Sequence, residues 1–397
     1  YYCSTSSYIV HRNPPDQNHS IIRHITHQTH RTQQPSSCGA SAMISNRFSP
    51  SPTRHTSMQK LMLLAEVAAL VVSVSSLSVP PADRLSTKSG VPVCRYGLGG
   101  AARSVQPSGL PPLYRDGLAQ DGYPHGAPFL FYYNPNRYPA FLDGVREVCA
   151  SNREDVYVAS GGTDRDPASL DQRLSDALDK CGGGYLDAFV LEYVCPEELA
   201  VGVYDPDPLQ RLEPGPDLEG ALDHVRDWVS MGQVRHIGIS THSHVAGGVM
   251  ARHPSVDLLL LRYGISHKQA AEEVSLPAAR EHGKPVIAFT TTRWNALQEG
   301  AGVEGWPEAS WPTTGECLSF PLRSRSSPPV EVVLHPARDE VELKDAMDGI
   351  RMGLATEGDE EQEERESILL QYGEIVDGSN TDFYDEYPEE RFLKAAS

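Results

Sequence analysis

The amino-acid sequence predicts an α/β protein whose main part is a (β/α)8 TIM barrel. Short apolar runs recur eight times between residues 93 and 334. Most of these runs are separated by stretches with the spacing of amphipathic helices. Several runs also end in small hydroxyl, histidine or acidic residues, and the carboxyl ends of parallel strands are where such folds bind ligands. Together the three observations favour a parallel barrel with a site at one face.

The eight predicted strands are short and apolar, and turn residues bound them, as is typical of strands buried on both faces. They cover residues 93–100, 129–134, 156–161, 186–192, 235–242, 256–263, 286–291 and 330–334. The fifth is the clearest, because Ile237 and Ile239 flank a small Gly238 and the run ends in a polar Ser-Thr-His sequence.

Six helices are predicted between and after these strands, at residues 139–150, 168–181, 218–231, 243–253, 269–282 and 339–352. We expect helices to start near Asp166 and Asp217 and to stop at Gly182 and Gly283. This regular alternation matches a closed barrel better than an open sheet. Two irregular stretches, 101–128 and 295–325, are expected to be loops on the catalytic face or replaced helices.

The chain ends differ in composition from the predicted barrel, which we place at 86–355. Residues 1–57 lack apolar periodicity, and we expect a disordered or non-native leader. Residues 58–78 follow the plan of a signal or presequence, because Met58 and Lys60 precede an apolar run that ends in small residues. This predicts the secretory pathway or an organelle, such as the lumen or stroma of a plastid, with the cytoplasm as the alternative. Residues 356–397 are expected to be an acidic tail that begins as a solvated helix or linker.

The net charge is −19, from 53 acidic and 34 basic residues. This balance disfavours a general nucleic-acid binder, which needs a basic surface to meet phosphates, and favours small or cationic partners. The apolar run of the presequence is too short to span a bilayer comfortably, so no membrane association is expected after its removal. The seven cysteines form no C-x-x-C pair, so the sequence predicts neither a metal site nor a disulfide framework. It carries no signal for an oligomeric state.

Four segments of the predicted barrel resemble the aldo-keto reductases, in the order expected for that family. They are LDHVRDWVSMGQVRHIGISTHS at 222–243, GGGYLDAFVLEYVCP at 182–196, AAREHGKPVIAFTTTRW at 278–294 and VEVVLHPARDEVELKDAM at 330–347. The resemblance covers about residues 93–352. It implies a barrel that binds NADP(H) without a Rossmann domain and transfers a hydride between nicotinamide and a small carbonyl or alcohol substrate.

The resemblance implies a catalytic Asp, Tyr, Lys and His, of which this sequence retains only the Tyr, at Tyr138. Tyr133 stands at the place of the Asp, Gly161 at the place of the Lys and Glu192 at the place of the His. A partly desolvated carboxyl group at a barrel mouth can stay protonated and donate to a carbonyl oxygen. We therefore predict that Tyr138 and Glu192 share the acid role. The structural alternatives are a Tyr138 packed on the rim and a salt-bridged Glu192 without a substrate role.

The cofactor side is predicted from polar residues that follow the fifth, seventh and eighth strands. These are Ser240, Thr241, His242, Thr290, Thr291, Thr292, Arg293, His335, Arg338 and Glu342. The first three would face the nicotinamide, although Thr241 stands where the family has Asn and Leu260 where it has Gln. Arg338, near a helix start after the eighth strand, is expected to hold a 2′-phosphate, with Glu342 at the adenine edge. The alternative for Arg338 is a solvated helix surface.

Three functions remain open from the sequence. The first is an NADP(H)-dependent oxidoreductase with an altered catalytic set. The second is a non-catalytic NADP(H)-binding pseudoenzyme that acts as a sensor or binds a partner, which the missing Lys and His favour. The third is a hydrolase or lyase that uses Glu192, and the absence of a second carboxylate at a strand end weakens it.

Overall fold

The computed structural model describes residues 85–100, 126–133, 138–182, 184–202, 211–266, 268–293, 295–300, 305–323, 330–337, 339–355 and 360–378. The predicted leader (1–57) and presequence (58–78) lie outside these residues, as do Arg338 and the chain beyond 378. No helix in the described ranges has both the length and the apolarity needed to cross a membrane.

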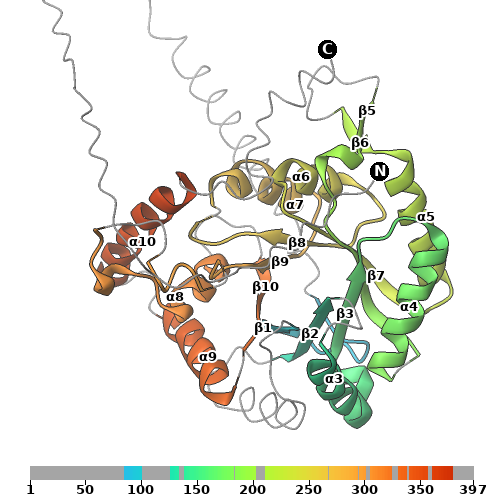
Figure 1. Ribbon diagram of the computed structural model, residues 1–397, viewed down its shortest axis with the longest axis horizontal. Coiled ribbons are helices and arrows are strands. Elements are labelled where there is room, and N and C mark those ends of the chain that lie inside the picture. Colours follow the sequence, from blue (N-terminus) through green and yellow to red (C-terminus); the bar gives the residue numbers. More distant parts are fainter. Residues whose placement is uncertain are drawn as a thin grey trace, which may run out of the picture. The chain divides into compact units, whose positions relative to one another are not determined.

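Eight parallel strands close into a barrel, which confirms the predicted fold class (Figure 1). In order around the barrel they are β1 (Val93–Gly99), β2 (Ala127–Tyr133), β3 (Tyr157–Gly162), β4 (Leu186–Leu191), β7 (Val234–Thr241), β8 (Leu258–Arg262), β9 (Val286–Phe289) and β10 (Val330–His335). The ring closes where β1 pairs with β10, with Tyr96 opposite Val333 and Leu98 opposite His335. Each strand overlaps one of the predicted apolar runs.

Alternate residues of the strands divide the apolar side chains into two buried groups. One group fills the inside of the barrel and includes Phe129, Tyr157, Ala159, Ala188, Val190, Leu258, Leu260, Ile287, Val332 and Leu334. The larger group lies between the strands and the surrounding helices. The strands are therefore buried on both faces, as their nearly continuous apolar sequences predict.

The helices that follow the strands are α3 (Pro139–Asn152), α4 (Pro167–Cys181), α5 (Pro216–Ser230), α6 (His244–Arg252), α7 (Leu276–Glu281) and α9 (Glu340–Ala355). At α4 both predicted ends are confirmed: Asp166 accepts a hydrogen bond from the Ser169 N–H, and Gly182 adopts φ +63°. Helix α5 starts at Pro216, just before the expected Asp217, because proline suits a first helical turn. The predicted helix at 269–282 contains a π-helical turn, Ala271–Ser275, ahead of α7.

The structure adds elements that the sequence pattern did not predict. A two-stranded antiparallel sheet of β5 (Leu199–Val201) and β6 (Leu212–Pro214) lies between β4 and α5. Helix α8 (Thr314–Ser319) lies within the irregular 295–325 stretch. Short 3₁₀ turns occur at Arg153–Asp155, Pro196–Glu198, Glu308–Ser310 and Phe320–Leu322.

The start of the acidic tail differs from the expectation of a solvated segment. It forms α10 (Glu360–Gly378), in which Glu366, Leu369 and Tyr372 are buried. These residues recur every third position and form one stripe, which the acidic composition obscured. Leu369 and Tyr372 join the apolar group around the barrel, so α10 packs with it.

The amino-terminal end of the barrel is held together by one buried carboxylate. Asp187 on β4 is fully buried and pairs with Arg153 at 2.7 Å and with Arg235 at 2.5 Å. It also accepts a hydrogen bond of 2.9 Å from the backbone N–H of Val158 on β3. Arg235 in turn donates to the carbonyl of Ser86 at 3.1 Å. Asp187 thus joins β3, β4, β7 and the segment that precedes β1.

Candidate active site

Glu192 lies at the carboxyl end of β4, the face on which barrels of this type carry their sites. Its backbone is fixed, because its N–H donates to the Gly162 carbonyl at 2.9 Å and its carbonyl accepts from Arg165 at 2.9 Å. Its side chain is 1% exposed. Within the described part of the chain, the buried Oε1 atom has no hydrogen-bond partner and the carboxyl group forms no ion pair. The described residues therefore do not show the salt bridge that the structural alternative for Glu192 requires.

Burial raises the pKa of the Glu192 carboxyl well above its usual range. Arg173 and Arg165 act in the opposite direction, since positive charges favour the carboxylate, and Asp164 adds to the rise. Each arginine has a closer acid, because Arg165 pairs with Glu198 at 2.6 Å and Arg173 with Asp164 at 3.3 Å. Desolvation therefore dominates, and Glu192 favours the neutral form, which can donate a proton.

An aromatic row lies beside Glu192 and was only partly predicted. Tyr193 follows Glu192 directly, adopts φ +54° and is 44% exposed. Its ring stacks on His242 at a centroid distance of 5.2 Å, and His242 contacts Phe289 at 5.4 Å. A bulky residue at positive φ is strained, and such strain gathers at functional sites. Tyr193 and Phe289 were missed because only polar residues after the strands were considered, although both occupy strand ends in the sequence.

The structure brings Ser240, Thr241 and His242 to the same place, at the end of β7. The Ser240 hydroxyl accepts from the Tyr193 N–H at 3.3 Å. The Thr241 hydroxyl donates to the Val194 carbonyl at 2.7 Å and accepts from the Ser243 N–H at 2.9 Å. Both hydroxyls therefore position the loop that carries Glu192 and Tyr193.

Tyr138 precedes the first turn of α3 and packs against the apolar group between the strands and the helices. Its partner in the predicted acid role, Glu192, makes no side-chain hydrogen bond in the described residues, so none joins the two. Residues 134–137, which connect Tyr138 to β2, lie outside the described ranges. The shared role of Tyr138 stays a prediction.

Two glycines shape the space at the mouth. A Cβ atom at Gly161, the position where the family carries Lys, would overlap the backbone carbonyl of Val190 on β4. No side chain fits there unless the strands move. By contrast, a Cβ atom at Gly99, the last residue of β1, would meet no atom of the described residues within 4 Å. The mouth is therefore closed to a lysine beside β4, whereas the described residues leave room beside β1.

The loop after β9 carries the predicted residues Thr290 to Arg293. Thr290 adopts φ +58° and Arg293 φ +49°, and the Arg293 N–H donates to the Thr290 carbonyl at 2.8 Å. Thr291 and Thr292 are buried. Positive φ values at non-glycine residues cost roughly 1–3 kcal/mol each. The surrounding structure therefore has to stabilise this loop conformation against backbone strain.

His335, a predicted cofactor-binding residue at the end of β10, lies beside Glu342 of α9, which was predicted for the adenine edge. His335 is buried, with Nε2 3.8 Å from Glu342 Oε1 and Nδ1 3.1 Å from the hydroxyl of Tyr96 on β1. Burial and the Glu342 charge raise the pKa of Tyr96, so its phenol stays neutral. Tyr96 was missed, because only closure of the barrel brings β1 beside β10. The expected partner Arg338 lies outside the described residues.

No family model and no curated protein matches the chain. Solved structures that are similar in shape include the following three. An aldose reductase from Giardia lamblia is 13% identical, with a TM-score of 0.47 over 76% of this chain and 97% of that one. An aldo-keto reductase from Klebsiella pneumoniae in complex with NADPH is 14% identical, with a TM-score of 0.47 over 72% and 95%. An aldo/keto reductase from Klebsiella pneumoniae in complex with NADP and acetate is 14% identical, with a TM-score of 0.45 over 68% and 89%. At this level of similarity, the site's own residues have to carry any functional assignment.

Proposed function

We propose that this protein is an aldo-keto reductase-like, NADP(H)-dependent oxidoreductase that acts on a small carbonyl or alcohol substrate. The observation that carries the proposal is the buried Glu192 at the carboxyl end of a barrel strand, with an oxygen that has no partner in the described residues and a carboxyl pKa that burial raises. Reduction of a carbonyl needs a proton at the oxygen as a hydride reaches the carbon, and a neutral carboxyl group is suited to supply it.

The residues at the mouth fit a nicotinamide dinucleotide. Gly99 carries no side chain that would crowd a ring at the end of β1, and Phe289 offers a partly buried aromatic face. The strained loop from Thr290 to Arg293 brings hydroxyl groups and a cation to the end of β9, where phosphates commonly bind in barrels. Bound NADPH supplies the hydride.

Glu192 then performs the proton chemistry. Its carboxyl O–H bond breaks as the proton passes to the substrate oxygen, and a carboxylate remains. Arg165 and Arg173 favour that anion electrostatically, which limits the cost of forming it in a buried site. A proton from solvent restores the neutral acid. In alcohol oxidation the same steps run in reverse, with the carboxylate as the base.

The first test is calorimetric titration of the full chain with NADPH and, for comparison, NADH. We expect NADPH to bind more tightly. A hydride-transfer assay with small aldehydes and ketones follows, with Glu192→Gln and Glu197→Gln as matched variants, since Glu197 is an exposed carboxyl in the same loop. Glu192→Gln should keep NADPH affinity and lose about 10²–10⁴-fold in kcat, while Glu197→Gln keeps both. Equal activity of the two variants removes Glu192 from the mechanism.

A non-catalytic NADP(H)-binding protein is the second candidate, and the position of Gly161 favours it. The backbone of β4 excludes a lysine at residue 161, and the resemblance to aldo-keto reductases implies a catalytic lysine at that position. Tight NADPH binding without hydride transfer to any carbonyl would select this candidate. Failure of both nucleotides to bind up to millimolar concentration would reject both candidates.

A further inference from the structure

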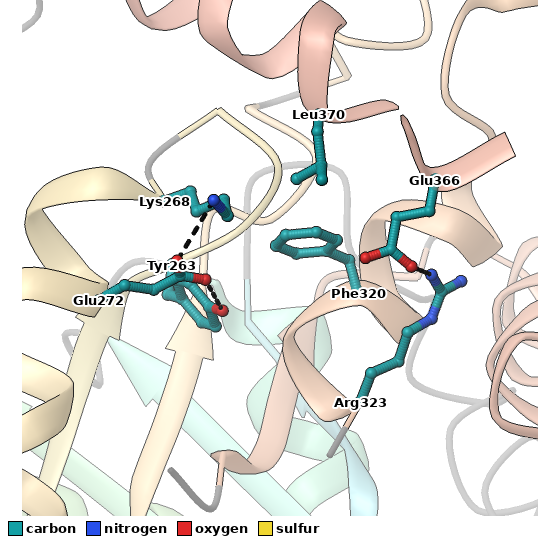
Figure 2. A pocket seen from close by; sticks show the side chains of 7 residues that line it. All are labelled: Tyr263, Lys268, Glu272, Phe320, Arg323, Glu366 and Leu370. Carbon is teal, nitrogen blue, oxygen red and sulfur yellow. Dashed lines mark hydrogen bonds and ion pairs between the residues drawn. The ribbon is translucent and has the colours of Figure 1, made fainter. Parts of the chain in front are cut away.

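A pocket whose lining does not include Glu192 lies between the barrel and α10 (Figure 2). Its volume is ≈ 150 Å³. It is lined by residues that follow β8 and β9 and by residues of α10, namely Tyr263, Lys268, Glu272, Phe320, Arg323, Glu366 and Leu370. A cavity of this size accommodates an apolar group up to about the size of benzene, and the side chains of valine and leucine are smaller than that.

The charges of the pocket lie on two opposite sides. On the barrel side, Lys268 pairs with Glu272 at 3.3 Å, and the Tyr263 hydroxyl donates to Glu272 at 2.9 Å. On the other side, Arg323 pairs with Glu366 of α10 at 2.6 Å. Figure 2 shows Phe320 and Leu370 between the two groups. The lining therefore carries two positive and two negative charges around an apolar centre.

The two ion pairs differ in exposure. The side chains of Arg323 and Glu366 are 2% and 3% exposed, whereas those of Lys268 and Glu272 are 37% and 26% exposed. Burying a charge is costly unless it stays paired, so Arg323 and Glu366 have to remain together on the α10 side of the pocket. The Lys268–Glu272 pair, in contrast, can be reached from solvent.

We propose that this pocket binds a small zwitterion with a short apolar side chain, of the size of a branched α-amino acid. An ammonium group has three donors, so Lys268 can hold Glu272 and a ligand carboxylate together. A carboxylate has about four lone-pair sites, so Glu272 and Glu366 can accept from a ligand ammonium and keep their present partners. Phe320 and Leu370 suit the apolar side chain. The lining carries equal numbers of positive and negative side chains. A ligand with a single charge would interact favourably only with the side chains of opposite sign.

The proposal is independent of the function assigned to the mouth, because none of the pocket residues belongs to the Glu192 site. It is tested by titrating the full chain with leucine and valine, followed by calorimetry or saturation-transfer NMR. Two matched compounds remove one charge each: isopentylamine lacks the carboxylate, and 4-methylpentanoate lacks the ammonium. We expect the amino acids to bind at about millimolar concentration or below, and each matched compound to bind about tenfold more weakly. No binding of the amino acids, or equal binding of all compounds, overturns the proposal.

Two variants locate the site. Leu370→Trp fills the pocket and should abolish leucine binding, while Ile375→Trp, at an exposed position of the same helix, should not. Lys268→Gln changes a partly exposed side chain and leaves the buried pair intact. It should weaken leucine binding about tenfold and leave isopentylamine unchanged, so it decides the matter even if Leu370→Trp does not fold. Undiminished leucine binding in Lys268→Gln contradicts the site.

Discussion

Two buried carboxylates at opposite ends of β4, Asp187 and Glu192, have opposite surroundings. Asp187 is surrounded by two arginines and a backbone N–H, all within hydrogen-bond distance. Glu192 is buried to almost the same degree, yet its Oε1 atom has no hydrogen-bond partner among the described residues. Burial alone therefore does not decide the state of a carboxyl group; the donors around it do.

The difference separates an end of the barrel with a paired carboxylate from an end with a carboxyl oxygen that has no partner among the described residues. The amino-terminal end satisfies its buried charge and ties four segments of chain together. The carboxyl-terminal end holds an unsatisfied acid, and residues with positive φ, such as Tyr193 and Thr290, lie in its loops. Barrels commonly divide stability and chemistry between their two ends in this way.

Removal of Asp187 should have the largest effect on stability. Asp187→Ala leaves Arg153 and Arg235 without their shared partner, and we expect the free energy of unfolding to fall by about 3–5 kcal/mol. Urea denaturation measures this, with Glu192→Gln as the comparison at the other end of β4. A loss below about 1 kcal/mol for Asp187→Ala would contradict the proposed difference between the two ends.

A side chain at Gly161 should have the next largest effect. Gly161→Ala drives a Cβ atom into the Val190 carbonyl, and we expect a loss of about 1–3 kcal/mol. Gly184→Ala is the matched control, since a Cβ atom there meets nothing within 4 Å. Equal urea midpoints for the two variants would contradict the close approach of β3 and β4 at Gly161.

The pH dependence of stability distinguishes Glu192 from an ordinary carboxylate. Its folded-state pKa is raised above the unfolded value of about 4.3, so its contribution to stability is fully present below that pH and is lost as the pH rises through the folded pKa. Glu192→Gln cannot ionise. Above about pH 4.3 the wild type should therefore lose stability relative to Glu192→Gln, by at most about 1.4 kcal/mol per pH unit. Urea denaturation of both proteins across this pH range tests the sign of the difference. If the wild type instead becomes more stable relative to Glu192→Gln as the pH rises, Glu192 is ionised and stabilised in the folded protein, and the prediction is wrong.

The smallest effect is expected at Tyr193, where the strain can be separated from the stacking. Tyr193→Leu and Tyr193→Asn both remove the ring that stacks on His242. Asn tolerates the left-handed backbone better than Leu, so Tyr193→Asn should be the more stable variant by about 1 kcal/mol. Equal denaturation midpoints for the two would show that φ at residue 193 relaxes without cost.

Local sequence patterns were sufficient for the barrel and for part of the site. Runs such as 235–242 carry their strand signal in their own residues, and Asp166 with Gly182 mark both ends of α4. Glu192 was singled out through the resemblance to aldo-keto reductases, because it stands where that family has His. The rise of its pKa depends on burial and on the charges that the fold brings near it, and sequence does not give that.

The features that sequence reasoning missed depend on closure of the barrel or on backbone angles. Tyr96 meets His335 only because β1 and β10 become neighbours, far apart as they are in the chain. The positive φ of Tyr193 has no signal in a residue type that rarely adopts it. In α10 the buried stripe was present in the sequence, but the acidic residues around it suggested solvent on every side.

Helix α10 also has a consequence for the order in which the protein is assembled during synthesis. Tyr372 donates to the Leu297 carbonyl at 2.9 Å, and Arg365 donates to the carbonyls of Ser310 and Trp311 at 3.3 and 2.9 Å. These carbonyls belong to the segment after β9. The ribosome translates all eight strands before it reaches α10, so the barrel can close while this segment still lacks those donors. The segment after β9 therefore gains these donors only once α10 has left the ribosomal tunnel.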